Sequence, residues 1–210
     1  MEVVVKLLSE TSISYSDLAD LLHDAFEERL GQGLHFTCST MTAEQFESKM
    51  KGGYVFVALD NETEELLGTV TIHLDTDKHG IIFGYQEYLA VSPRAKHSGV
   101  GTALAKAWNA LVQEKEAKYV LSDTACKATS SVEWHLKNGF QIFGLESYRS
   151  TNYWSYVFIK YLDDSIRKTR LQLKLRYWCS WLFIKTTRHQ NGTDTAFGKL
   201  YKRIKAKCKN

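Results

Sequence analysis

The chain has 210 residues, of which 44% are hydrophobic and 24% charged, with a mean hydropathy of −0.30. This composition excludes a disordered chain, a collagen-like chain and a polytopic membrane protein. The four cysteines form no Cys-x-x-Cys pair, which favours reduced thiols in a cytoplasmic protein over a disulfide framework or a zinc site. We therefore expect a cytoplasmic protein without a bound metal.

Charge is distributed unevenly along the chain. Residues 1–162 carry 14 Lys and Arg against 21 Asp and Glu, a net charge of −7, whereas residues 163–210 carry 13 against 3, a net charge of +10. Such a difference is typical of a core domain with a basic appendage. We predict a domain over residues 1–162 and a basic, aromatic extension over residues 163–210.

The pattern of the first residues indicates a strand followed by a helix. Residues 2–8 alternate weakly, as a strand does, and the apolar residues of 18–30 repeat with a helical period that Gly31 ends. Ser16 or Asp17 is the expected N-cap of this helix.

A second helix and three strands are expected next. Thr42 and Gln45 have the spacing of a capping box, which begins a short helix that ends at the following glycines. The strand predictions that follow cover residues 54–59, 66–73 and 81–91.

The rest of the first domain alternates between helices and strands. Two more helices are predicted at 99–116 and 130–137, a strand at 119–122, and a closing hairpin at 140–146 and 153–161. The expected order is therefore β-α-α-β-β-β-α-β-α-β-β, which is a mixed α/β domain.

The most informative stretch is residues 89–104, where a strand ends, a basic loop follows and two glycines begin a helix. Gly99 and Gly101 allow the backbone to approach an anion closely, and Lys96 and His97 add cationic character. Helix N-termini bind phosphates because their first N–H groups are unpaired. The P-loop and Rossmann patterns are both absent, and a tight strand-to-helix turn is the alternative interpretation of the two glycines.

Two segments carry a resemblance to a known family. Val91-Ser-Pro-x-x-Lys96-x-x-Gly99-x-Gly101 resembles the acetyl-CoA loop of the GNAT superfamily of N-acetyltransferases. Ser130-Ser131, followed by Trp134-His135-x-Lys137-x-Gly139-Phe140, is similar to that family's Asn/Ser…Tyr-x-Lys-x-Gly-Phe segment. The resemblance covers residues 1–162 and implies the GNAT fold, with the basic extension unexplained. Lys96 stands where the family has Arg or Gln, and His135 stands where it commonly has a tyrosine acid.

The resemblance implies a site for acetyl-CoA. The end of the fourth strand would hold pantetheine and stabilise the developing oxyanion, while the pyrophosphate would rest on the amides of the glycine loop. The residues implied are Leu89, Ala90 and Val91 on the strand, Lys96, His97, Ser98, Gly99, Val100, Gly101 and Thr102 in the loop, and Ser130 or Ser131 on the CoA arm.

Three residues are candidates for the two proton transfers. His135 would protonate the departing thiolate, and the alternative is a histidine that packs beneath the end of its helix. Glu87 and Tyr85, on the strand that leads to the cofactor, would accept the proton of the acceptor amine or hold a water. The alternative for Glu87 is an ordinary solvated glutamate.

The basic extension fits a strand or a helix equally well, because its apolar residues match both periods. We favour a role in covering the core domain or a neighbouring subunit. The other roles are peripheral contact of residues 163–210 with an anionic membrane and nucleic-acid binding, of which the last is the least favoured.

These observations predict an enzyme that transfers acetyl from acetyl-CoA to a primary amine. A small molecule such as an amino sugar is the first choice of acceptor, and the protein is a possible homo-oligomer. The alternatives are a protein N-acetyltransferase and a non-catalytic acyl-CoA-binding module that docks through its basic tail.

Overall fold

The computed structural model describes residues 2–148, 150–189, 191 and 193–207. It contains two compact units, the first formed by residues 2–122 with 161–164 and the second by the described parts of 123–160 and 165–207. Cys208, Lys209 and Asn210, at the end of the predicted basic extension, lie outside the described residues. The predicted division at residue 162 stays a prediction.

The first unit is built on a mixed sheet. Its strands follow the order β1-β2-β3-β4-β5, with antiparallel neighbours except for the parallel pair of β4 and β5. The last three residues of β5 belong to the second unit. The elements are β1 Val3–Leu7, α1 Tyr15–Gly31, α2 Ala43–Met50, β2 Tyr54–Asp60, β3 Leu66–Thr76, β4 Ile82–Val91, α3 Val100–Glu114 and β5 Tyr119–Ala125.

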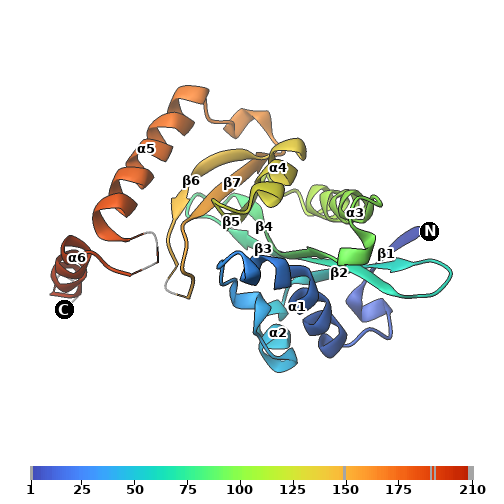
Figure 1. Ribbon diagram of the computed structural model, residues 1–210. Coiled ribbons are helices and arrows are strands. Elements are labelled where there is room, and N and C mark those ends of the chain that lie inside the picture. The colour runs from blue at the N-terminus through green and yellow to red at the C-terminus, as the bar shows by residue number, and fades with distance from the viewer. Residues whose placement is uncertain (1, 149, 190, 192, 208–210) are drawn as a thin grey trace. The chain divides into compact units, whose positions relative to one another are not determined.

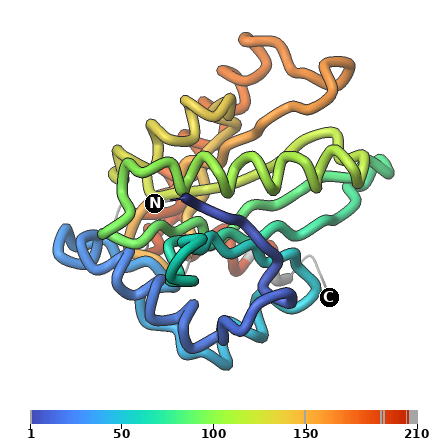
Figure 2. Tube along the Cα trace, turned by 90° about the vertical axis from the view of Figure 1, so that its right-hand side faces the viewer, coloured from blue at the N-terminus to red at the C-terminus, as the bar shows by residue number. Residues whose placement is uncertain are grey.

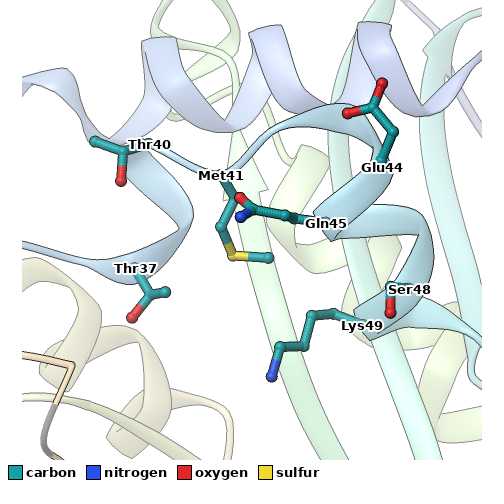
Figure 3. A pocket seen from close by; sticks show the side chains of 7 residues that line it. All are labelled: Thr37, Thr40, Met41, Glu44, Gln45, Ser48 and Lys49. Atoms are coloured by element: carbon teal, nitrogen blue, oxygen red, sulfur yellow. The ribbon is translucent and has the colours of Figure 1, made fainter.

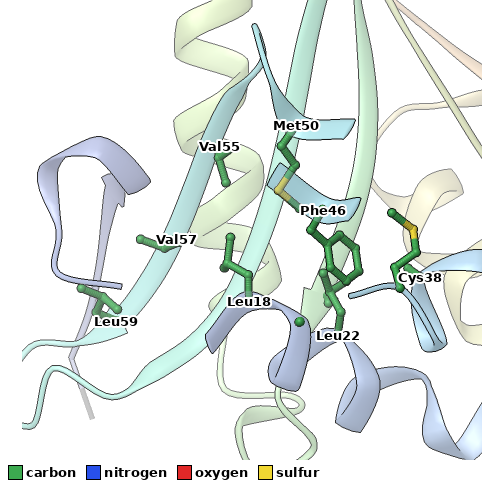
Figure 4. Packing of buried hydrophobic residues seen from close by; sticks show 11 residues of the cluster. Leu18, Leu22, Cys38, Phe46, Met50, Val55, Val57 and Leu59 are labelled. Carbon is green, nitrogen blue, oxygen red and sulfur yellow. The ribbon is translucent and has the colours of Figure 1, made fainter. Parts of the chain in front are cut away.

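Helices cover both faces of this sheet (Figures 1 and 2). On the α3 face, Gly68 of β3 lets the first turn of the helix approach, since a Cβ there would lie 2.8 Å from Val100 Cγ1. The opposite face packs against α1 and α2 (Figure 4). The buried residues of that cluster are Leu18, Ala19, Leu22, Cys38, Met41, Phe46, Met50, Val55, Val57, Leu59 and Ala90.

The first two helices begin with capping boxes. Ser14, and not Ser16 or Asp17, is the N-cap of α1: its N–H donates to Asp17 Oδ2 at 2.7 Å, and its hydroxyl accepts from Asp17 N at 3.2 Å. The reciprocal bonds decide the start, because they satisfy two backbone donors at once. The capping box predicted for Thr42 and Gln45 is confirmed, with its two bonds at 3.0 and 3.4 Å.

The second unit contains a helix, a hairpin and the two helices of the extension. Strands β6 and β7 are antiparallel, with a register shift at Phe143 between Ile142 and Gly144. The elements are α4 Thr129–Lys137, β6 Gln141–Glu146, β7 Ser155–Tyr161, α5 Arg170–Thr187 and α6 Ala196–Lys207. The last residue of β7 belongs to the first unit. The mixed α/β fold and the predicted order of elements up to β7 are thus confirmed.

One face of α5 packs on β6. Ser180 Oγ accepts the N–H of Leu145 at 3.0 Å and donates to the Tyr177 carbonyl oxygen at 2.8 Å. The Arg176 guanidinium lies 3.8 Å from the centre of the Phe143 ring, and Gly144 leaves room for Ser180. The helix that periodicity alone left undecided is therefore fixed by contacts with the hairpin.

The end of α5 is joined tightly to α6. A Cβ at Gly198 would overlap the carbonyl oxygen of Thr187, so the first turn of α6 requires glycine there. Asp194, in the connection, forms ion pairs with Arg188 and Lys202. None of the helices in the described part of the chain is long and apolar enough to cross a membrane.

The three described cysteines have free thiols. Cys38 is buried in the first unit and Cys126 is half-buried in the second, while Cys179 is exposed on α5. Burial raises the pKa of both Cys38 and Cys126 to about 12, so these two thiols stay protonated near neutral pH.

Candidate active site

A β-bulge interrupts β4 shortly before its end. Tyr88 and Leu89 of β4 face the single residue Val70 of β3, and Tyr88 has a φ of +52°. Such a backbone costs a non-glycine residue about 1–2 kcal/mol. The Tyr88 ring packs edge-on against Phe46 of α2, with 5.6 Å between centroids, which helps to hold the bulge. The bulge turns the side chains of Glu87 and Tyr88 to the same face of the sheet, toward α1 and α2.

Polar side chains of β3 and β4 gather beside this bulge, and we call Thr71, His73, Tyr85 and Glu87 the β3–β4 polar cluster. The register pairs Thr71 with Glu87 and His73 with Tyr85. His73 Nε2 lies 3.6 Å from Glu87 Oε2, and the Glu87 side chain is 37% exposed. Thr71 Oγ1 and His73 Nε2 are buried without a hydrogen-bond partner among the described residues.

This arrangement suits a general base. Burial lowers the pKa of His73, so its imidazole is neutral near pH 7 and can accept a proton or orient the Glu87 carboxylate. The separation of 3.6 Å exceeds a direct hydrogen bond, so proton transfer between the two side chains requires a closer approach. Glu87 and Tyr85 were expected from the sequence. His73 was missed, although its alternation with Thr71 along one strand face was visible.

The start of α3 is the second notable feature. Gly99 is its N-cap, with a φ of +89°, and no side chain caps the helix. The Gly99 carbonyl accepts the N–H of Ala103 at 2.9 Å, so the first-turn amides of Val100, Gly101 and Thr102 have no partner within the helix. A Cβ on Gly99 would meet no heavy atom within 4 Å. Open space in front of unpaired amides fits an anionic group such as a pyrophosphate.

The loop before α3 holds its cations in exposed ion pairs. Lys96 Nζ lies 2.9 Å from Glu28 Oε2 of α1, a hydrogen bond that lowers the pKa of Glu28. His97 has a φ of +66°, and the Ser98 N–H and hydroxyl both donate to the Ala95 carbonyl, at 3.3 and 2.6 Å. Because exposed pairs contribute little, a phosphate can replace Glu28 as the partner of Lys96. The Ser98 amide, in contrast, is already engaged.

The end of β4 lies against β3. Ala90 pairs with Thr69 and Val91 with Gly68, beyond the bulge at Leu89. The parallel pairing with β5 covers 83–86. Within the first unit, the edge of β4 at Leu89–Val91 is therefore not occupied by β5, which suits a backbone ligand such as pantetheine.

The other predicted residues belong to the second unit. Ser130 and Ser131 lie in the first turn of α4, whose N-cap Ala128 supplies no side-chain bond. His135 is only 3% exposed; its ring stacks on Phe158 at 4.5 Å, and Phe140 packs edge-on at 5.2 Å. The His135 Nδ1–H donates to the Ser131 carbonyl oxygen at 2.7 Å, because a carbonyl can only accept.

Burial lowers the pKa of His135 to about 4. About one molecule in a thousand therefore carries the imidazolium near pH 7, where an acid catalyst needs that form. These observations support the alternative of a histidine that packs beneath the helix. The acid role of His135 stays a prediction that the variant described below tests.

A hollow of about 510 Å³ is lined by residues of segment 37–41 and of α2 (Figure 3). Six of its seven lining residues are polar or charged and carry hydroxyl, amide, carboxylate or ammonium groups, while their aliphatic parts and one methionine also line it. Met41 also belongs to the buried cluster against which Tyr88 packs. The lining residues are Thr37, Thr40, Met41, Glu44, Gln45, Ser48 and Lys49.

Comparison with known proteins agrees with this geometry. Residues 51–142 match the model of the acetyltransferase (GNAT) domain, a stretch that includes the bulged strand β4 and all of α3. The fold and the matched domain define an acyltransferase. Residues 51–142 thus match a GNAT acetyltransferase domain, the family that the two sequence segments predicted. No curated protein matches the chain.

Several solved structures share the fold. A GCN5-related N-acetyltransferase from Kribbella flavida is 17% identical, with a TM-score of 0.61 over 76% of this chain and 98% of that one. A GNAT family acetyltransferase from Elizabethkingia anophelis with acetyl-CoA bound is 17% identical, with a TM-score of 0.56 over 76% and 98%. A chain of the NatC complex bound to Gag peptide and CoA is 16% identical, with a TM-score of 0.56 over 77% and 99%. At these identities the likeness concerns the fold alone.

Proposed function

We propose that this protein transfers an acetyl group from acetyl-CoA to a primary amine of a small molecule such as an amino sugar. The observation that carries the proposal is the Glu87–His73 pair beside the bulge of β4, on the strand that ends at the glycine loop. Acetyl-CoA supplies a thioester whose carbonyl carbon forms the new C–N bond as the C–S bond breaks. The protein must bind it and remove a proton from the amine.

The residues that hold acetyl-CoA in this proposal are backbone groups of β4 and α3. The edge of β4 at Leu89–Val91 holds the pantetheine arm, and its N–H groups stabilise negative charge on the carbonyl oxygen. The amides of Gly99 to Thr102 hold the pyrophosphate, with Lys96 as a counter-charge. Ser130 or Ser131 contacts the CoA arm. The unpaired amides and the open space before Gly99 support this assignment.

Glu87 is the general base of the proposed reaction. A protonated amine has no lone pair with which to attack, and an alkyl ammonium group such as that of lysine has an ordinary pKa of about 10.4, so the acceptor must lose a proton. The Glu87 carboxylate is accessible and takes this proton, directly or through a water held by Thr71 and Tyr85. His73 is a positioning residue that orients Glu87 from the neighbouring strand.

The hollow on α2 supports a small polar acceptor. Its hydroxyl and amide groups match the hydroxyls of a sugar, and Glu44 is a carboxylate that can pair with an ammonium group. Met41 connects the hollow to the cluster that contains Tyr88, the neighbour of Glu87.

The test compares Glu87→Gln with the native protein in an assay of CoA release over a panel of amino sugars. We expect a loss of about a hundredfold to ten-thousandfold in kcat near neutral pH, the range for general-base catalysis. The loss should shrink as the pH approaches the pKa of the amine. Glu114→Gln, the same change at an exposed position of α3, is the matched control and should keep full activity.

Calorimetric titration with acetyl-CoA separates the alternatives. Acetyl-CoA binding with turnover on peptides and none on amino sugars would indicate a protein N-acetyltransferase. Binding without turnover on any amine would indicate a non-catalytic module. No binding to the folded protein would overturn the proposal.

A further inference from the structure

Helix α5 has apolar residues on two opposite faces. At 100° per residue, Leu173, Ser180, Ile184 and Thr187 share the face that packs inward. A second row of apolar residues lies on the opposite side of the helix. We call this row the outward stripe; it consists of Leu171, Leu175, Trp178 and Leu182.

The outward stripe is exposed. Its four side chains are 56% to 66% accessible to solvent, and their spacing of four, three and four residues keeps them on one line. Isolated exposed leucines are ordinary on protein surfaces, but an aligned row of three leucines and a tryptophan marks a contact surface. The hairpin needs only the inward face of α5, so the stripe is not explained by folding of this unit.

The charge around the stripe points to an anionic partner. Residues 165–210 contain thirteen Lys and Arg and one acid, Asp194, which is already paired with Arg188 and Lys202. Lys174 and Lys185 lie beside the stripe on the helix surface, and Lys185 Nζ is 4.5 Å from the centre of the Trp181 ring. The sequence of α5 contains no carboxylate.

The same charge opposes a second copy of this chain as the partner. Apolar rows with this spacing also form coiled-coil seams, which are stabilised by opposite charges at their borders. Two α5 helices would instead bring Lys174 and Lys185 against further cations without a carboxylate to neutralise them. Self-association through the stripe is therefore disfavoured.

The chemistry of the stripe favours lipid over nucleic acid. Bases are held by exposed aromatic rings, whereas this row is mostly leucine, which gains from contact with acyl chains. Tryptophan and lysine suit the boundary, since the indole has an apolar body and the lysine stem can lie along lipid while its ammonium reaches phosphate. Helix α5 carries too many polar residues around its circumference to span a membrane. Its composition fits a helix that lies in the plane of the membrane–water interface.

We propose that α5 binds the surface of an anionic lipid bilayer, with the outward stripe inserted at the level of the headgroups and the lysines on lipid phosphates. Helix α6 adds to the same chemistry, with exposed Phe197, Leu200 and Tyr201 and several cations. The inference is independent of the proposed acetyl transfer, because none of its residues belongs to the candidate active site.

The test is flotation of the full-length protein with two kinds of vesicle. One kind contains phosphatidylcholine alone, and in the other about a third of the lipid is phosphatidylglycerol. We expect binding that requires phosphatidylglycerol and weakens as salt is added, because headgroup attraction is screened. Leu175→Glu should weaken the binding by about tenfold or more, as loss of one buried leucine predicts. Gln172→Glu adds the same charge to α5 away from the stripe and preserves the capping box with Thr169, so it should retain most of the binding.

Four results would overturn the proposal, and the first three concern the vesicles and self-association. They are equal binding to neutral and anionic vesicles, equal loss in the Leu175→Glu and Gln172→Glu variants, and a dimer in light scattering that Leu175→Glu dissociates. Tight binding of single-stranded RNA with no binding to vesicles would assign the surface to nucleic acid instead. Circular dichroism of both variants checks that α5 has remained folded, as the exposure of both positions predicts.

Discussion

The β3–β4 polar cluster and the aromatic surroundings of His135 each contain a histidine whose pKa is lowered by burial. His135 is enclosed by Phe140 and Phe158, and its Nδ1–H is bound to a backbone carbonyl. His73 Nε2 instead faces a carboxylate at 3.6 Å, beside the Thr71 hydroxyl, which has no hydrogen-bond partner in the described part of the chain. Burial alone therefore does not distinguish a structural histidine from one suited to chemistry. The partner of the ring nitrogen does.

The starts of two helices show the same contrast. At α5, Thr169 and Gln172 close the helix with a capping box, at 2.8 and 3.3 Å. At α3, Gly99 offers no side chain, and the first-turn amides stay available. The first-turn N–H groups of α3, which a side-chain cap would normally bind, are therefore available to a ligand near the end of β4.

Among the variants that test the contrast between His73 and His135, His73→Asn should have the largest effect on kcat. If His73 orients Glu87, kcat should fall about tenfold to a hundredfold, the range for residues that position a catalytic group. The KM for acetyl-CoA should not change, and the acidic limb of the pH–rate profile, which reports protonation of the Glu87 carboxylate, should move. The same loss of kcat at every pH, together with a lower melting temperature, would show a merely structural role.

Gly99→Ala should weaken acetyl-CoA binding by about tenfold, because its methyl group enters the space before the unpaired amides. The φ of +89° adds a strain of about 1 kcal/mol to the folded state. Gly80→Ala is the control, since Gly80 has a φ of +78° and equally open surroundings in the β3–β4 turn. Calorimetric titration should show unchanged affinity in the control, and equal losses would refute the assignment.

His135→Phe should leave kcat within about twofold of the native value if the ring only packs. It should also change the response to acid. The folded pKa of about 4 lies below the ordinary 6.5, so the unfolded chain binds a proton first and stability is lost as the pH falls between these values. The native protein should lose at most about 3 kcal/mol of its free energy of unfolding in this way, and the His135→Phe variant should not show this loss. Urea unfolding at neutral and mildly acidic pH measures the difference, and a large drop in kcat would restore His135 as the acid.

Thr71→Val should have the smallest effect on folding, with a gain of up to about 1 kcal/mol in the free energy of unfolding. The substitution replaces a buried hydroxyl, without a partner among the residues that the structure describes, by a methyl group. A fall in kcat of a few-fold would accompany it if Oγ1 holds a water for Glu87. Thr69→Val is the control: its hydroxyl donates to the Phe56 carbonyl at 2.9 Å, so the substitution should destabilise the protein. Chemical denaturation that ranks the two variants the other way would contradict the contrast.

The sequence was sufficient for most of the elements because their periodicity is strong and their ends carry glycine, proline or capping residues. The start of α1 was misplaced because the apolar repeat begins at Leu18, while the reciprocal bonds of Ser14 and Asp17 act upstream of it. Helix α5 stayed undecided because Leu171, Leu173 and Leu175 also alternate as in a strand. Contacts with β6, distant in sequence, resolve the choice.

The candidate site was predictable where local sequence determines it. The glycine loop identifies the start of α3 without knowledge of the rest of the chain. The Glu87–His73 pair depends on the register of two strands and on a bulge at Tyr88, and neither is encoded in a motif. The surroundings of His135 likewise depend on tertiary packing. Its motif draws attention to it, but sequence periodicity does not show that the Phe158 ring stacks on it.

The thiols offer spectroscopic access to α5. Cys38 is buried, Cys126 is half-buried and both stay protonated near neutral pH, whereas Cys179 is exposed one residue after Trp178. In a chain with Cys208 replaced by serine, a maleimide dye would therefore react fastest at Cys179 among the described cysteines, at the border of the outward stripe. The emission wavelength of the dye would report the polarity of its surroundings at this border, and the candidate catalytic residues of the first unit would not be modified.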